Sequence, residues 1–149
     1  MDIQSSINKF LSFVQSNPQV TPELGELIEH LDLLSVCSHV SDIEFDENEY
    51  PEPPEKNYSE TRKDLEQKFP KLGLYYSVDS DVSSEESAEV TIGDAIDDLA
   101  DIVGDLTEVQ WYFENTSRNN ALWHFQLGYT SHWGLHLKEL QLFLHRQWW

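Results

Sequence analysis

The segment that most constrains the fold lies at residues 92–113, "IGDAIDDLADIVGDLTEVQWYF", because its apolar and acidic residues separate onto two faces of a helix. An α-helix advances roughly 100° per residue. At that spacing an apolar stripe contains Ala95, Leu99, Ile102, Leu106, Val109 and Phe113. An acidic stripe, centred about 100° away within an arc of about 80°, contains Asp94, Asp98, Asp101, Asp105 and Glu108. The pattern predicts a long amphipathic helix, and the capping-box form of "TIGD" at 91–94 places its start near Thr91.

The acidic stripe is costly for an isolated helix. Like charges at i,i+3 and i,i+4 destabilise a helix by about a few tenths of a kcal/mol per pair. No Lys or Arg lies between Glu89 and Arg118 to offset this repulsion locally. Because a solvated helix face normally mixes charges of both signs, this stripe is not typical of a purely solvated surface.

The rest of the chain predicts further helices. Apolar residues at helical spacing indicate helices over residues 2–16, from Thr21 to about Ile43 and from about Arg118 to His145, with a short helix from Ser59 to about Lys68. The brief turn at 115–117 makes the last two long helices antiparallel neighbours. We therefore predict an all-α fold, a single domain over residues 1–149 built as a bundle of about four long helices and one short helix.

Two segments interrupt the helical pattern. Residues 42–57 are acidic and rich in proline, which predicts an extended linker. Residues 77–91 are acidic and rich in serine, which predicts a mobile surface loop. Between these segments, "LGLYYSV" at 72–78 is compatible with a brief strand or with a packed aromatic loop.

Charge and composition restrict the function. The 149 residues include 28 acidic and 9 basic ones, a formal net charge of −19. This charge disfavours nucleic acids and anionic membranes, and favours a basic protein partner, a cation or solubility. No apolar run approaches the roughly 20 residues of a membrane helix, and "MDIQSSINKF" carries no secretory signal pattern. Cys37, the single cysteine, fits a buried apolar position and a reducing compartment, so we expect a soluble cytoplasmic protein.

A histidine-rich stretch, "HFQLGYTSHWGLHL" at 124–137, supplies the candidate site. A regular helix places His132 and His136 one turn apart on its apolar face, and His124 at the edge of that face. Counting from the turn near Thr116 places both inward histidines at the height of Asp98 and Asp101. Among the acidic stripe, Asp98 and Asp105 lie nearest the apolar face, so they are best placed to reach inward.

Three interpretations of this cluster remain open. In the first, the histidines and aspartates form a hydrogen-bonded polar layer in the core. In the second, they bind a divalent metal, with His132, His136, Asp98, Asp101 and Asp105 as candidate ligands. The third, His–Asp acid–base catalysis, lacks an evident nucleophile. Helical nucleotide pyrophosphatases use carboxylates on two helices, which here would be Glu23, Glu26 and Glu29 on one helix with Asp98 and Asp101 on the other. This pattern is disfavoured because Glu26 and Glu29 face away from the apolar stripe of their helix.

The chain resembles a bacterial family known as domain of unknown function 5063. The likeness rests on "FPKLGLYY" (69–76), "GDAIDDLADIVGDL" (93–106) and "WHFQLGYTSHWGLHLKELQLFLH" (123–145), and it runs from the linker onward. Asp98, Asp101 and Asp105 keep the family pattern, as do His132, Trp133, Gly134 and His136. The chain departs at Val103-Gly104, where the family helix carries an aromatic and a basic residue. The resemblance implies an all-helical fold and no particular activity.

Two classes of function follow. One is an acidic helical binding or regulatory module with a structural His/Asp polar layer, which meets a protein partner through its linker, the 79–89 loop or the "RQWW" tail. The alternative is a metal-dependent hydrolase with its site between the two C-terminal helices. Nucleic-acid mimicry rests on charge alone. The sequence leaves the cofactor, the partner and the oligomeric state open.

Overall fold

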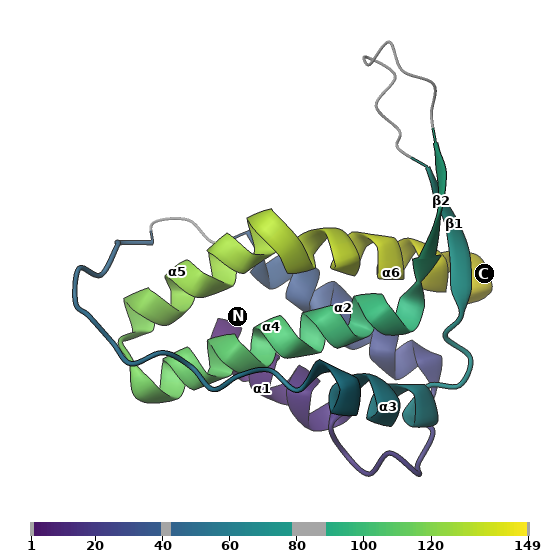
Figure 1. The fold of residues 1–149 in the computed structure, drawn as a ribbon, viewed down its shortest axis with the longest axis horizontal. Helices are drawn as coiled ribbons and strands as arrows, with labels where there is room; N and C mark the ends of the chain where they lie inside the picture. Colours follow the sequence, from purple (N-terminus) through teal and green to yellow (C-terminus); the bar gives the residue numbers. More distant parts are fainter. Residues whose placement is uncertain (1, 40–42, 79–88, 149) are drawn as a thin grey trace.

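The computed structural model describes residues 2–39, 43–78 and 89–148, and within these ranges the chain is mostly helical (Figure 1). In chain order the elements are α1 (Ile3–Val14), α2 (Leu24–Cys37), α3 (Tyr58–Lys68), β1 (Leu74–Val78), β2 (Val90–Asp94), α4 (Ala95–Asn115), α5 (Arg118–Gly128), the π-helical turn η1 (Tyr129–Trp133) and α6 (Gly134–Trp148). Because α5, η1 and α6 follow one another without a break, they form one long helix. The predicted set of long helices with one short helix is therefore present, in the company of a small sheet.

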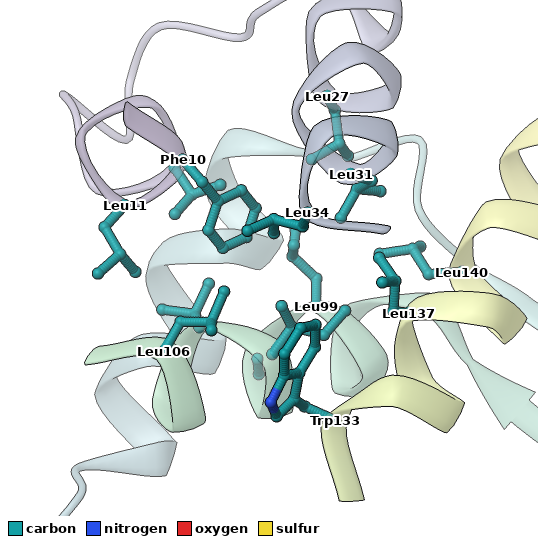
Figure 2. Packing of buried hydrophobic residues seen from close by; sticks show 14 of the residues in the cluster. Phe10, Leu11, Leu27, Leu31, Leu34, Leu99, Leu106, Trp133, Leu137 and Leu140 are labelled. Carbon is teal, nitrogen blue, oxygen red and sulfur yellow. The ribbon is translucent and has the colours of Figure 1, made fainter. Parts of the chain in front are cut away.

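The helix α4 lies at the centre of the bundle. It packs against α1, α3, α5 and α6, while α2 packs against α1 and α6. The apolar stripe predicted for this helix enters the core: Ala95, Leu99, Ile102 and Leu106 are fully buried and Val109 nearly so. Figure 2 shows Leu99 and Leu106 packed with leucines from α1, α2 and α6 and with the indole of Trp133. Hydrophobic burial along one helix face thus places the acidic stripe at the edge of the core.

Side chains at the helix starts explain most boundaries. Asp2 caps α1, Asn57 caps α3 and Ser117 caps α5, each by accepting a backbone N–H hydrogen bond from the first turn. Three predicted boundaries are wrong. The second helix begins at Leu24 rather than Thr21 and ends at Cys37 rather than Ile43, and the short helix is capped by Asn57 rather than Ser59.

The all-α prediction is wrong for residues 74–78 and 90–94, which form an antiparallel two-stranded sheet. Tyr76 pairs with Ile92 and Val78 pairs with Val90 across this sheet. The "TIGD" segment belongs to β2, so Asp94 rather than Thr91 caps α4, through hydrogen bonds from the backbone N–H groups of residues 96 and 97. The ends of the predicted 77–91 loop are therefore strand, and residues 79–88 lie outside the described ranges.

The proline-rich segment has no regular secondary structure over residues 43–57, as predicted, and runs along α4 towards α3 (Figure 1). Residues 40–42 lie outside the described ranges. Three side chains attach this segment to the bundle: Asp46 accepts a hydrogen bond from Ser117, the ring of Phe45 packs edge-on against Trp123, and Lys56 contacts the acidic stripe of α4.

Candidate functional site

Every carboxylate of the acidic stripe on α4 has a partner from another part of the chain. The contacts are Asp94 with Arg62, Asp98 and Asp101 with His136, Asp105 with His132 and Lys56, and Glu108 with Lys56. These partners come from α3, from the proline-rich segment and from the C-terminal helix. Tertiary contacts thus supply the compensation that the sequence of α4 does not provide locally.

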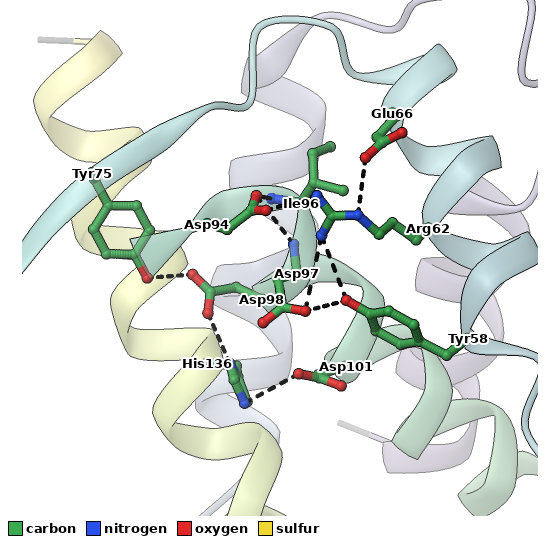
Figure 3. Close-up of polar contacts among 10 residues, drawn as sticks. All are labelled: Tyr58, Arg62, Glu66, Tyr75, Asp94, Ile96, Asp97, Asp98, Asp101 and His136. Atoms are coloured by element: carbon green, nitrogen blue, oxygen red, sulfur yellow. Dashed lines mark hydrogen bonds and ion pairs between the residues drawn. The ribbon is translucent and has the colours of Figure 1, made fainter. Parts of the chain in front are cut away.

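His136 on α6 lies between two of these carboxylates (Figure 3). Its Nδ1 is 2.7 Å from Oδ1 of Asp98, and its Nε2 is 3.3 Å from Oδ2 of Asp101. Only 7% of the Asp98 side chain is exposed, so the charge of this carboxylate is poorly screened by water. Chiefly through the hydrogen bond with Asp98, the surroundings raise the pKa of His136 above its usual value. The position therefore favours a positive charge.

Tyr75 on β1 completes the contacts of Asp98. Its hydroxyl donates a hydrogen bond to Oδ2 of Asp98, with an O–O distance of 2.5 Å. Burial raises the pKa of Tyr75, so the phenol remains protonated and acts as the donor. The ring lies against the backbone of Gly93 on β2, where a Cβ atom would come within 2.2 Å of it. Tyr75 was not among the predicted site residues, because only the strand pairing brings it to α4.

His132 pairs with Asp105 rather than with Asp98 or Asp101. Its Nδ1 is 2.7 Å from Oδ2 of Asp105, whose Oδ1 is 2.6 Å from Nζ of Lys56. Side chains tilt towards the N-terminus of their own helix. In an antiparallel pair of helices this tilt moves the histidine side chain towards the connecting loop and the aspartate side chain away from it. His132 therefore meets Asp105, which lies one helical turn closer to that loop than the predicted partner Asp101.

The prediction that His132 points into the bundle is wrong, since 47% of its side chain is exposed. A regular α-helix would return residue 132, seven positions after Phe125, to the core face. The π-helical turn adds one residue, so Trp133 takes that position, fully buried with its ring 5.1 Å from that of Phe125. His132 and His136 consequently lie at the edge of the core, beside the acidic stripe.

Two glycines fit this irregular turn. A Cβ on Gly134 would come within 2.2 Å of the carbonyl oxygen of Tyr129, and a Cβ on Gly128 would come within 2.9 Å of the Trp133 ring. Cβ atoms essentially never approach other atoms so closely, so a side chain at Gly134 would require a shift of the backbone and one at Gly128 a shift of the Trp133 ring. The glycines therefore accommodate the π-helical turn and the indole.

The geometry brings three potential metal ligands together. Atoms of Asp101, His132 and His136 that can bind a metal all lie within 4.8 Å of one another, and the two imidazole rings are 5.0 Å apart. Both Nδ1 atoms face carboxylates, Asp105 for His132 and Asp98 for His136. This arrangement fixes the ring orientation and makes the two Nε2 atoms the candidate metal ligands, of which that of His136 contacts Oδ2 of Asp101 at 3.3 Å. We call these five residues (Asp98, Asp101, Asp105, His132 and His136) the His/Asp cluster.

Other residues considered from the sequence lie apart from the His/Asp cluster. His124 stacks on Tyr112 with ring centroids 3.8 Å apart, and burial lowers its pKa. The side chains of Glu23, Glu26 and Glu29 are exposed on α2, in agreement with their exclusion. Cys37 is buried, as predicted.

A second polar group braces the start of α4 beside the cluster (Figure 3). Arg62 on α3 is 2.7 Å from Asp94 and 2.9 Å from Glu66, and Tyr58 donates a hydrogen bond to Asp97. The contacts of Arg62 with Asp94 and of Tyr58 with Asp97 hold α3 against the start of α4. They therefore position the helix segment that carries Asp98.

The fold and the site define a helical bundle with a two-stranded sheet and a His/Asp cluster between its central and C-terminal helices. The chain belongs to the family described as "Domain of unknown function (DUF5063)", which matches residues 2–147. The match confirms the resemblance found in the sequence and extends it to the N-terminal helices.

One solved structure is similar in fold. The crystal structure of protein BF1032 from Bacteroides fragilis, a structural-genomics target, aligns with a TM-score of 0.75 at 19% identity. The alignment covers 96% of this chain and 87% of the other. No match was found among curated proteins. In the described ranges, no helix has the length and apolar character needed to span a membrane.

Proposed function

We propose that the chain is a helical binding module whose His/Asp cluster holds one divalent transition-metal ion, with Asp101, His132 and His136 as ligands. The observation that carries the proposal is the pairing of each Nδ1 atom with a carboxylate at 2.7 Å, beside a third carboxylate. Metal-binding histidines usually donate their second N–H to such a group, which fixes the tautomer and makes the imidazole a stronger ligand.

The ligand set indicates the class of metal. Imidazole suits zinc, nickel, copper and iron, whereas magnesium and calcium prefer sets made only of oxygen atoms. A set of two histidines and one carboxylate leaves coordination positions for water or another ligand. His132 is half exposed, so an ion reaches the cluster without opening the core. The proposal concerns binding alone, because the family carries no assigned reaction.

The charge of the site supports a cation. Besides the three partner carboxylates of the histidines, Glu108 lies within 3.3 Å of Lys56 at the same edge. When no metal is bound, the positive charge beside Asp98 is that of the protonated imidazole of His136. A metal ion between His136 and Asp101 would take the place of that proton.

The test uses chelator-stripped protein titrated with zinc, nickel and magnesium, with bound metal measured by mass spectrometry and stability by thermal unfolding. At a free metal concentration about 100 times Kd, binding stabilises the folded state by about 2.7 kcal/mol. For a chain of this size, the Tm rises by roughly 5–10 °C. We expect this rise with zinc or nickel and no comparable rise with magnesium.

Three variants assign the effect to the cluster. His132→Ala and Asp101→Asn should abolish the rise in Tm, whereas His145→Ala should retain it, because His145 is exposed near the end of α6. If no ion is retained, or if the first two variants respond like the unmodified protein, the cluster is a structural polar layer and the proposal is wrong.

The proposal also includes the cellular compartment and the kind of partner. We infer a cytoplasmic protein, since the single cysteine is buried and suits a reducing compartment. The net charge of −19 favours a basic protein partner over nucleic acid.

A further inference from the structure

One face of the β1–β2 hairpin is apolar and exposed. We call it the outer face, formed by Leu74, Tyr76, Val78, Val90 and Ile92, whose exposed fractions range from 51% to 74%. Tyr76 lies opposite Ile92 and Val78 opposite Val90, so four of these side chains form two adjacent cross-strand pairs. The strands stand beside the helical body rather than between its layers (Figure 1). Continuous apolar patches of this kind usually mark contact sites.

The opposite face of the hairpin is already occupied. The ring of Tyr75 packs against Phe143 on α6, with centroids 5.7 Å apart, and Ser77 donates a hydrogen bond to Glu139 at 3.2 Å. These contacts fix which face points away from the bundle. The exposure of the outer face is therefore built into the fold.

The hairpin also has free edges. In the described ranges, β1 and β2 pair only with each other, so each strand keeps an edge with unpaired backbone N–H and C=O groups. Two-stranded sheets are marginally stable alone, and a third strand would pair the free edge and cover apolar surface. Addition of an extended peptide to such an edge is a common mode of recognition.

Charge identifies the occupant. Residues 74–94 contain no Lys or Arg, and the whole chain carries a net charge of −19. A second copy of the hairpin would bring like charges together. A basic segment would instead be attracted to Glu139, which lies beside the face of the hairpin that packs on α6. We propose that the hairpin docks an extended segment of a partner protein in which apolar and basic side chains alternate. Its apolar side chains extend the outer face and its basic ones lie on the Glu139 side.

The probe is a fluorescently labelled peptide of four Leu-Lys repeats, measured by anisotropy against the full chain. We expect saturable binding at one peptide per chain, and binding weaker by about tenfold or more for Leu-Glu and Ser-Lys repeats, because they lack the basic or the apolar side chains. Methylation of alternate peptide amides should weaken binding to a similar extent, because it removes main-chain hydrogen bonds to the strand edge, and unchanged binding would overturn addition of the peptide at that edge.

Two double variants locate the contact. Tyr76→Ser with Ile92→Ser should weaken binding by about tenfold or more. Leu135→Ser with Leu142→Ser, which removes exposed leucines from α6, should leave it unchanged. Equal binding by both variants would show general attraction to an acidic protein and overturn the proposal. A dimer in light scattering that the hairpin variant converts to monomer would assign the face to a second copy and also overturn it.

Discussion

At the scale of single residues, Asp98 connects the sheet with the C-terminal helix. One of its oxygens accepts from Tyr75 and the other contacts His136. Removing one member of a buried charged pair leaves the other without its partner, which costs more than the pair itself contributes. The local arrangement therefore depends more on this aspartate than on its neighbours along the stripe.

We predict that Asp98→Asn lowers the free energy of unfolding by about 2 kcal/mol at pH 7, because it removes the charged partner of His136. Asp97→Asn is the matched control. Its side chain is 42% exposed, so the expected change is within about 0.5 kcal/mol. Urea denaturation of both variants measures the difference. Equal effects would contradict the special position of Asp98.

A second prediction concerns His124, whose pKa is lowered by burial. The folded state resists protonation here, while the unfolded chain takes up a proton as the pH falls below about 6.5. Stability is therefore lost as the pH falls from that value towards the folded pKa. His124→Phe keeps a ring against Tyr112 and removes this proton uptake.

The measurement is the difference in Tm between pH 7.5 and pH 5.5 for the metal-free chain. We expect a smaller difference in His124→Phe than in the unmodified protein. A difference of the same size in both would show that the proton uptake of His124 does not contribute to acid sensitivity.

At the scale of elements, local periodicity was sufficient to predict which residues are buried where a single helix face packs against the core. The stripe from Ala95 to Val109 is buried as predicted, and Asp98 and Asp105 are the most buried of the candidate aspartates. The sheet was not predicted as such, because strand pairing joins residues 74–78 to 90–94 across intervening sequence. Tyr75 and Lys56 were not predicted for the same reason, because they reach the site from segments that lie far from α4 in the sequence.

The π-helical turn was missed for another reason. A helical wheel assumes a constant advance per residue, so one extra residue shifts everything that follows by about 100°. The predicted face was therefore displaced at His132, whose expected place in the core is taken by Trp133. The two interior glycines were the signal in the sequence, because this turn leaves no space for a Cβ at either position.

We predict that Gly134→Ala destabilises the chain by about 1–3 kcal/mol, since the new Cβ overlaps the Tyr129 carbonyl. Gly104→Ala in α4 is the control, because the nearest atom to its Cβ would be Cδ of Lys56 at 3.6 Å. That variant should be neutral or more stable by up to about 1 kcal/mol. Thermal unfolding distinguishes them, and a neutral Gly134→Ala would contradict the role of the turn.

At the scale of the whole molecule, α4 gathers contacts from both ends of the chain. It packs against α1 near the N-terminus and against α6 near the C-terminus. Its acidic face collects Lys56 and Arg62, two of the nine basic residues, while the remaining carboxylates leave a large net charge. Salt should therefore screen the repulsion among exposed carboxylates more strongly than the attraction between the acidic face of α4 and its basic partners.

We predict that Tm rises when KCl is increased from 20 to 500 mM at pH 7.5. Salt screens the repulsion among exposed carboxylates, while the partly buried contacts of the cluster are screened less. Differential scanning calorimetry at several salt concentrations measures this. A fall in Tm would mean that ion pairs outweigh the repulsion.

The π-helical turn between Tyr129 and Trp133 should also allow the helix to tolerate the deletion of one residue. Insertion of one residue into an α-helix normally rotates everything after it, but a π-helical turn absorbs one residue and keeps the flanking helices in place. Deletion of one codon at Thr130 or Ser131 should therefore keep both Phe125 and Leu137 in the core. We expect alignments of relatives to contain a one-residue gap here, within a helix, where gaps are otherwise rare.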